Sequence, residues 1–153
     1  MINLVLNEWF LHDINNDNGE KKLEETSRLL ERIIQQSQFK LFIPSNSPWI
    51  DKARRIAANQ REPTHKFMHL FFALVLRDSY RCQIVHDWNL TKIPNNIFRQ
   101  IPQEDVYLIK NAIIAAPCIL VSTDDALIKS VKNFQSELKI TPFHRDSWIS
   151  QII

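Results

Sequence analysis

One stretch of the chain decides the fold, residues 102–125, which read PQEDVYLIKNAIIAAPCILVSTDD. Pro102 suits the first turn of a helix, and the apolar residues after it predict a helix as far as Ala116. The next run, Cys118–Val121, is continuously apolar, which is typical of a strand buried on both faces. A capping hydroxyl residue after that strand predicts another helix, to about Phe134. This order of helix, buried strand and helix indicates a parallel α/β sheet.

The same alternation extends over the rest of the chain. Apolar residues at helical spacing predict a helix over residues 20–36, and Ser47-Pro48 predicts the start of another over 48–60. A very apolar helix is predicted over His65–Arg77. We expect strands at Ile2–Leu6, Phe39–Ile43, Cys82–Val85, Cys118–Val121 and Leu138–Ile140. No linker interrupts this pattern, so a single domain is predicted over residues 1–153.

Composition excludes several classes of protein. A chain of 153 residues that is 44% hydrophobic can bury a core without disulfides or a structural metal. The only glycine is Gly19, so the chain has no P-loop, no GxGxxG and no GxSxG sequence. Cys82 and Cys118 lie in apolar runs and are predicted to be reduced core residues. No apolar run approaches the length of a membrane span, and we expect a cytoplasmic protein without a membrane partner.

The net charge of +2 is unevenly distributed. Residues 1–51 carry −3, residues 52–99 carry +6 and residues 100–153 carry −1. A basic middle segment between acidic flanks suits a polyanion held beside an acidic centre, although a solvated basic surface is the alternative. The candidate phosphate-binding residues of this segment are Arg54, Arg55, Arg61 and Lys66.

Acidic and amide side chains occur where this topology predicts a ligand site. In an open parallel sheet, ligands bind beyond the carboxyl ends of the strands. Asn7 and Glu8 directly follow the first predicted strand, and Asp125 lies just beyond the fourth. Asp51 follows the second strand in a helical turn, and Asp105 opens the helix before the fourth. We therefore expect these side chains at one edge of the sheet.

The acid that opens a helix, the buried strand and the closing Thr-x-Asp sequence, Thr123 to Asp125, together resemble the PIN-domain family of metal-dependent ribonucleases. The resemblance is specific over residues 102–131, and the first strand and second helix fit the same layout. It implies a three-layer PIN-like α/β fold with a central, mostly parallel sheet of four to five strands. It also implies an endoribonuclease that hydrolyses phosphodiester bonds with Mg²⁺ or Mn²⁺.

The resemblance assigns roles to individual residues. The family's third and fourth acids correspond to Asp105 and Asp125, and its second corresponds to Asp51. Where the family has an aspartate after the first strand, this chain has Asn7 followed by Glu8. Asn7 offers a neutral carbonyl oxygen, so either it completes the site or Glu8 reaches in. All five are candidate catalytic residues, and Asp105, Asp125, Asp51 and Asn7 are the candidate metal ligands.

Electrostatics supports a metal independently of the family. Two carboxylates about 5 Å apart repel by roughly 3 kcal/mol at an effective dielectric constant of about 20, unless a cation lies between them or one is protonated. Oxygen ligands favour Mg²⁺ or Mn²⁺ over zinc. The alternative is that the acids only cap helices, because Ser122 to Asp125 matches a capping box and Asp105 follows Pro102 at a helix start.

Other candidate sites are weaker. His65 and His69 have the spacing of two zinc ligands on a helix, but no third ligand accompanies them. Trp49, near the expected site edge, is the tryptophan to test for base stacking.

Two classes of function remain open. One is the metal-dependent endoribonuclease, including a nuclease toxin paired with an antitoxin. The other is a catalytically silent PIN-like module that binds RNA or a protein partner, and the replacement of an acid by Asn7 favours it. RNA is the expected partner of the nuclease, with a protein antitoxin or inhibitor and a homodimer left open.

Overall fold

The computed structural model describes residues 1–153 and is built on a five-stranded sheet in the order β3-β2-β1-β4-β5. Every neighbouring pair of strands is parallel. Such a sheet needs a helical crossover between consecutive strands, which the long amphipathic segments of the chain supply. The strands are β1 (Ile2–Leu6), β2 (Phe39–Pro44), β3 (Cys82–Val85), β4 (Cys118–Ser122) and β5 (Ile140–His144).

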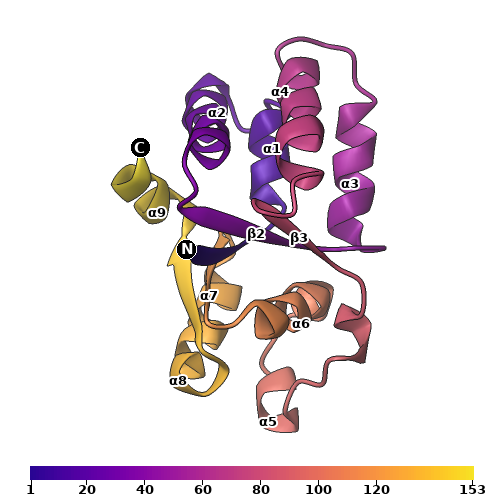
Figure 1. Ribbon diagram of the computed structural model, residues 1–153. Coiled ribbons are helices and arrows are strands. Elements are labelled where there is room, and N and C mark those ends of the chain that lie inside the picture. Colours follow the sequence, from indigo (N-terminus) through magenta and orange to yellow (C-terminus); the bar gives the residue numbers. More distant parts are fainter.

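Helices cover both faces of the sheet (Figure 1). One layer holds α1 (Trp9–Ile14), α2 (Glu20–Gln35), α3 (Pro48–Ala57), α4 (Thr64–Leu70) and the π-helix η1 (Phe71–Leu76). The other holds α5 (Asn95–Phe98), α6 (Val106–Ala115), α7 (Asp125–Asn133) and α8 (Gln135–Leu138), while α9 (Arg145–Ile152) lies beside α2. Two short 3₁₀ turns, η2 (Trp88–Leu90) and η3 (Gln103–Asp105), precede α5 and α6. The predicted three-layer α/β fold is confirmed.

Local signals explain where most elements begin. Ser47 caps α3 by accepting a hydrogen bond from the backbone N–H of Ile50 at 3.4 Å, and Pro48 occupies the first turn. The cap of α7 is Asp124, whose Oδ1 accepts from the N–H groups of Ala126 and Leu127. The prediction that Ser122 or Thr123 caps this helix was therefore wrong by one or two residues.

Three predicted boundaries were also wrong. The predicted strand at Leu138–Ile140 begins only at Ile140, because α8 ends at Leu138 and is followed by Lys139 in a left-handed conformation with φ 57°. The apolar segment 65–77 changes from an α-helix to a π-helix at Phe71. The predicted helix over 48–60 ends at Ala57.

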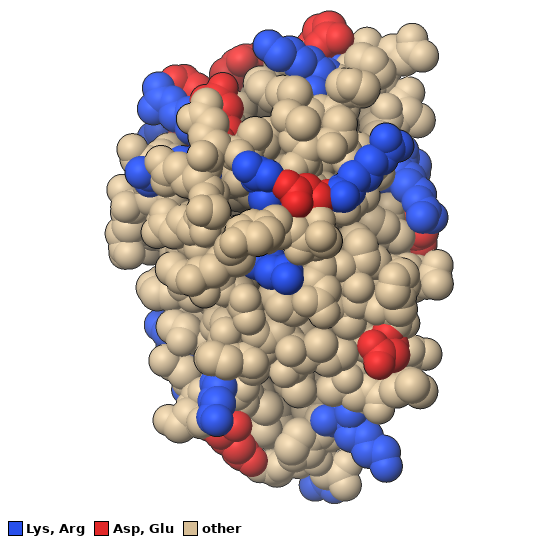
Figure 2. Space-filling model, in the orientation of Figure 1, with Lys and Arg blue, Asp and Glu red and all other residues tan.

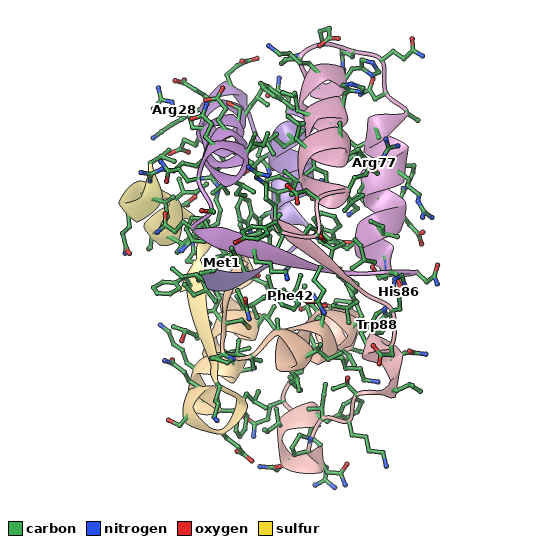
Figure 3. The ribbon with its side chains drawn as sticks, viewed as in Figure 1. Met1, Arg28, Phe42, Arg77, His86 and Trp88 are labelled. Atoms are coloured by element: carbon green, nitrogen blue, oxygen red, sulfur yellow. The ribbon has the colours of Figure 1, made fainter.

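The core joins both helical layers to the sheet. It contains 39 buried apolar residues, from Leu4 in β1 to Ile149 in α9. Figure 3 shows Phe42 of β2 within the molecule, while His86 and Trp88 lie beyond the end of β3. Cys82 and Cys118 are free and buried, as predicted, and burial raises the pKa of each thiol to about 12. None of the helices has the length and apolar character that a membrane span requires.

Candidate functional site

A polar cleft of about 350 Å³ opens at the carboxyl ends of the two central strands. Asn7 and Glu8 come from the end of β1, and Thr123 comes from the end of β4. Asp105 enters from the turn before α6, and His12 enters from α1. The sheet therefore brings together three of the predicted site residues, Asn7, Glu8 and Asp105.

Asp105 is the most unusual group in this cleft. It is only 7% exposed, and its Oδ2 atom has no hydrogen-bond partner. Although Asp105 precedes α6, its side chain makes no capping hydrogen bond, so helix capping does not account for this acid. Burial raises the pKa of Asp105 to about 7, with further contributions from the charges of Asp124, Glu104 and Glu8 and from a hydrogen bond with Asp124.

The carboxyl group beside Asp105 belongs to Asp124, one residue before the predicted Asp125. Asp124 both caps α7 and interacts electrostatically with Asp105. Asp125 is exposed in the first turn of α7. The sequence offered Asp124 as well as Asp125. Just as Asp125 lies two residues after Thr123, Asp124 lies two residues after Ser122, the last residue of β4.

Asn7 is held by local hydrogen bonds at the end of β1. Its Nδ2 donates to Ser122 Oγ at 3.1 Å, and its Oδ1 accepts from the backbone N–H of Glu8 at 2.7 Å. Ser122 Oγ in turn accepts from the backbone N–H of Asp124 at 3.0 Å. Asn7 thus connects the two strand ends and positions the loop that carries Asp124.

Lys52, and not Asp51, is the residue of α3 that contacts Glu8 of the cleft. Its Nζ lies 3.4 Å from Glu8 Oε2, whereas Asp51 is exposed on the first turn of the helix. Tyr107 is a buried neighbour of Glu8. Burial raises the pKa of its hydroxyl, and the negative charges of Glu8 and Asp105 raise it further. Sequence analysis missed both Lys52 and Tyr107, because neither belongs to a recognisable motif.

A chain of polar contacts continues from Lys52 along α1. Lys52 Nζ lies 3.1 Å from His12 Nε2, and His12 Nδ1 lies 2.9 Å from Asp17 Oδ2. A lysine ammonium only donates, so His12 accepts at Nε2 and donates from Nδ1 to Asp17. This arrangement assigns a neutral imidazole to His12 and leaves Lys52 as the cation of the group.

The donor set suits one hard cation held by few protein ligands. No group of three or more His, Cys, Asp or Glu side chains is arranged to hold a metal ion. The unpartnered oxygen of Asp105 and the nearby carboxylate of Asp124 offer two anionic oxygens, and Mg²⁺ is commonly bound by one or two carboxylates and several waters. The acid pair therefore fits Mg²⁺ or Mn²⁺. Asp105 lines the cleft and Asp124 acts on it from the start of α7, whereas Asp51 and Asp125 neither line the cleft nor act on Asp105.

The predicted phosphate-binding residues do not form one cluster. Arg54, Arg55, Arg61 and Lys66 are all exposed, and only Arg55 lines a pocket next to the cleft. On the face shown in Figure 2, basic side chains are interspersed with acidic ones and leave a broad uncharged area.

Trp49 belongs to the core. It is 2% exposed, and its ring stacks on Phe10 at a centroid distance of 6.5 Å. The suggestion that Trp49 stacks on a base was therefore wrong. His65 and His69 are exposed and join no metal-binding group.

Comparison of the chain with models of protein families and with curated proteins found no match.

Proposed function

We propose that the chain is a PIN-like, metal-dependent endoribonuclease that acts at the Asp105–Asp124 pair. The observation that carries this proposal is the buried, unpartnered Oδ2 atom of Asp105 in an acidic cleft. Leaving such an atom without a partner costs free energy, and a bound cation with its waters would remove that cost. The resemblance of residues 102–131 to the PIN-domain ribonucleases suggests an RNA phosphodiester as the substrate.

The residues of the cleft divide the chemistry between them. Asp105 and Asp124 would hold Mg²⁺ or Mn²⁺, which when bound activates water and neutralises charge on the phosphate. Glu8 is held by its ion pair with Lys52 and would accept a proton from the attacking water. Lys52 supplies the positive charge that a polyanionic strand needs beside two acids.

The second candidate is a catalytically silent PIN-like module that binds RNA or a protein partner. Two observations favour it: Asn7 is neutral and engaged in hydrogen bonds, and Lys52, which pairs with Glu8, lies on the helix where the family has an acid. A protein antitoxin or inhibitor is the partner that the resemblance suggests for either form, and a homodimer is the proposed assembly.

Cleavage of a mixed RNA pool distinguishes the two candidates. The wild-type protein should cut RNA in Mn²⁺ or Mg²⁺ and not in EDTA. Asp105→Asn and Asp124→Asn should each abolish cleavage, and Asn at position 124 still caps α7. Asp125→Asn is the matched control and should keep most of the activity. Equal activity in all three variants would contradict the proposal, and binding without cleavage by the wild-type protein would identify the silent module.

A further inference from the structure

A second pocket, of about 300 Å³, adjoins the acidic cleft between α1 and α3. His12 lines both spaces, so the two lie on either side of this residue. Lys52 and Arg55 line the second pocket from α3, and Asn15 and Asn59 line it from the ends of α1 and α3. This basic pocket, defined by His12, Lys52 and Arg55, is an open hollow whose lining side chains come from two helices.

Hydrogen-bond donors in the basic pocket remain available to an anion. Lys52 has three N–H donors, and its two observed contacts, with Glu8 and His12, leave one. Arg55 is exposed and enters none of the ion pairs of the protein, so its guanidinium can bind a phosphate through two parallel hydrogen bonds.

The one carboxylate in the basic pocket is already occupied. Asp17 accepts from His12 at 2.9 Å through Oδ2 and from Asn15 Nδ2 at 3.0 Å through Oδ1. The two cations therefore outnumber the single acid, whose oxygens are both bonded. An anion is the ligand that this balance of charge favours.

We propose that the basic pocket binds a phosphate of an RNA strand whose neighbouring phosphodiester lies at the acid pair. The identity of the strand rests on the proposed function, whereas the preference for phosphate rests on the pocket itself. The shared residue His12 places the two spaces side by side, and the proposed strand would extend past it from one to the other. The pocket would thus set the position of the strand relative to the acids.

Two neighbouring arginines of α3 provide a matched test. Arg55→Gln removes a cation from the pocket, and Arg54→Gln removes the same charge from an exposed residue outside it. Binding of a short labelled single-stranded RNA is measured in EDTA over a series of salt concentrations. Arg55→Gln should weaken binding about tenfold and reduce the salt slope by about 1, while Arg54→Gln should change affinity less than about twofold.

Inorganic phosphate serves as the second probe. It should shift the NMR signals of the His12 ring in the wild-type protein and compete with RNA, and Arg55→Gln should weaken both effects. Equal losses in the two arginine variants would overturn the pocket. Phosphate could still shift the His12 signals while Arg55→Gln leaves the RNA affinity unchanged. That result would show that the basic pocket binds phosphate but not RNA.

The same proteins are heated with and without Mn²⁺ to separate this proposal from the nuclease. The wild-type protein and Arg55→Gln should show the same Mn²⁺-dependent rise in Tm, because the acid pair is intact in both. If Mn²⁺ raises Tm in neither protein while Arg55→Gln still weakens RNA binding, the proposed metal site is wrong and the basic pocket stands.

Discussion

Asp105 couples the stability of the folded protein to pH. Because the pKa of this buried carboxyl group is raised to about 7, the folded state holds its proton at pH values where the unfolded chain, with a pKa near 3.8, has lost it. The contribution of Asp105 to stability is therefore greatest below about pH 4 and is lost as the pH rises to about 7. Above that pH the buried charged form of Asp105 destabilises the folded state.

The first prediction follows from this loss of stability with rising pH. Asp105→Asn should raise Tm at pH 8 in metal-free buffer and flatten the decline in stability between pH 4 and pH 7, because the amide carries no charge. Denaturation curves over this pH range measure the effect, with Asp125→Asn as the exposed control. An unchanged pH profile in Asp105→Asn would show that its carboxyl group is not buried as described.

Asn7 sets the charge at the end of β1. Asn7→Asp adds a carboxylate near Asp105 and Asp124, and repulsion should lower the metal-free stability at pH 8 by about 1–3 kcal/mol. With Mn²⁺ present, the variant should show a larger gain in Tm than the wild-type protein and should cleave RNA faster. A loss of stability without any extra gain in Mn²⁺ would mean that position 7 does not face the metal.

At the scale of elements, α9 contributes a buried arginine as well as core residues to its packing. Arg145 is 1% exposed and pairs with Asp13 of α1 at 3.0 Å and with Glu25 of α2 at 3.0 Å. Its guanidinium also lies 5.6 Å from the centre of the Trp9 ring. These contacts join the last helix to the layer that supports the site, because Trp9 directly follows Glu8.

Loss of this arginine should destabilise the whole protein. Arg145→Met should lower the free energy of unfolding by about 3–5 kcal/mol, because it leaves the charge of Asp13 buried and unpaired. The double variant with Asp13→Leu should recover much of that loss, since no buried charge remains. Urea denaturation of the two single variants and the double variant measures the coupling. Additive losses would exclude a significant ion pair.

At the scale of the whole molecule, metal binding should appear as thermal stabilisation. Mn²⁺ that binds the folded acid pair should raise Tm with concentration, because the unfolded chain separates the two carboxylates. Asp124→Asn should remove most of this rise, and Asp125→Asn should retain it. Calorimetry or circular dichroism at several Mn²⁺ concentrations measures the difference, and an equal rise in both variants would contradict the assignment to Asp124.

Local sequence patterns were sufficient for the sheet. The first and third strands were predicted with their observed bounds, and the second and fourth differ by one residue, because continuous apolar runs mark strands buried on both faces. The cleft could also be placed from sequence, since the carboxyl ends of parallel strands share one edge. For the same reason Asn7, Glu8 and Asp105 were correctly expected near one another.

The tertiary structure decided which of two neighbouring side chains interacts with Glu8 or Asp105. Successive residues of a helix point about 100° apart, so a shift of one position exchanges Asp51 for Lys52. The choice of Asp124 over Asp125 arose in the same way, because the start of α7 fixes which acid caps the helix and meets Asp105. Tyr107 lies near Glu8 only in the folded protein, and no local sequence pattern predicts that proximity. The sequence alone therefore determined the sheet and the edge that carries the site, and long-range packing determined the side chains that form it.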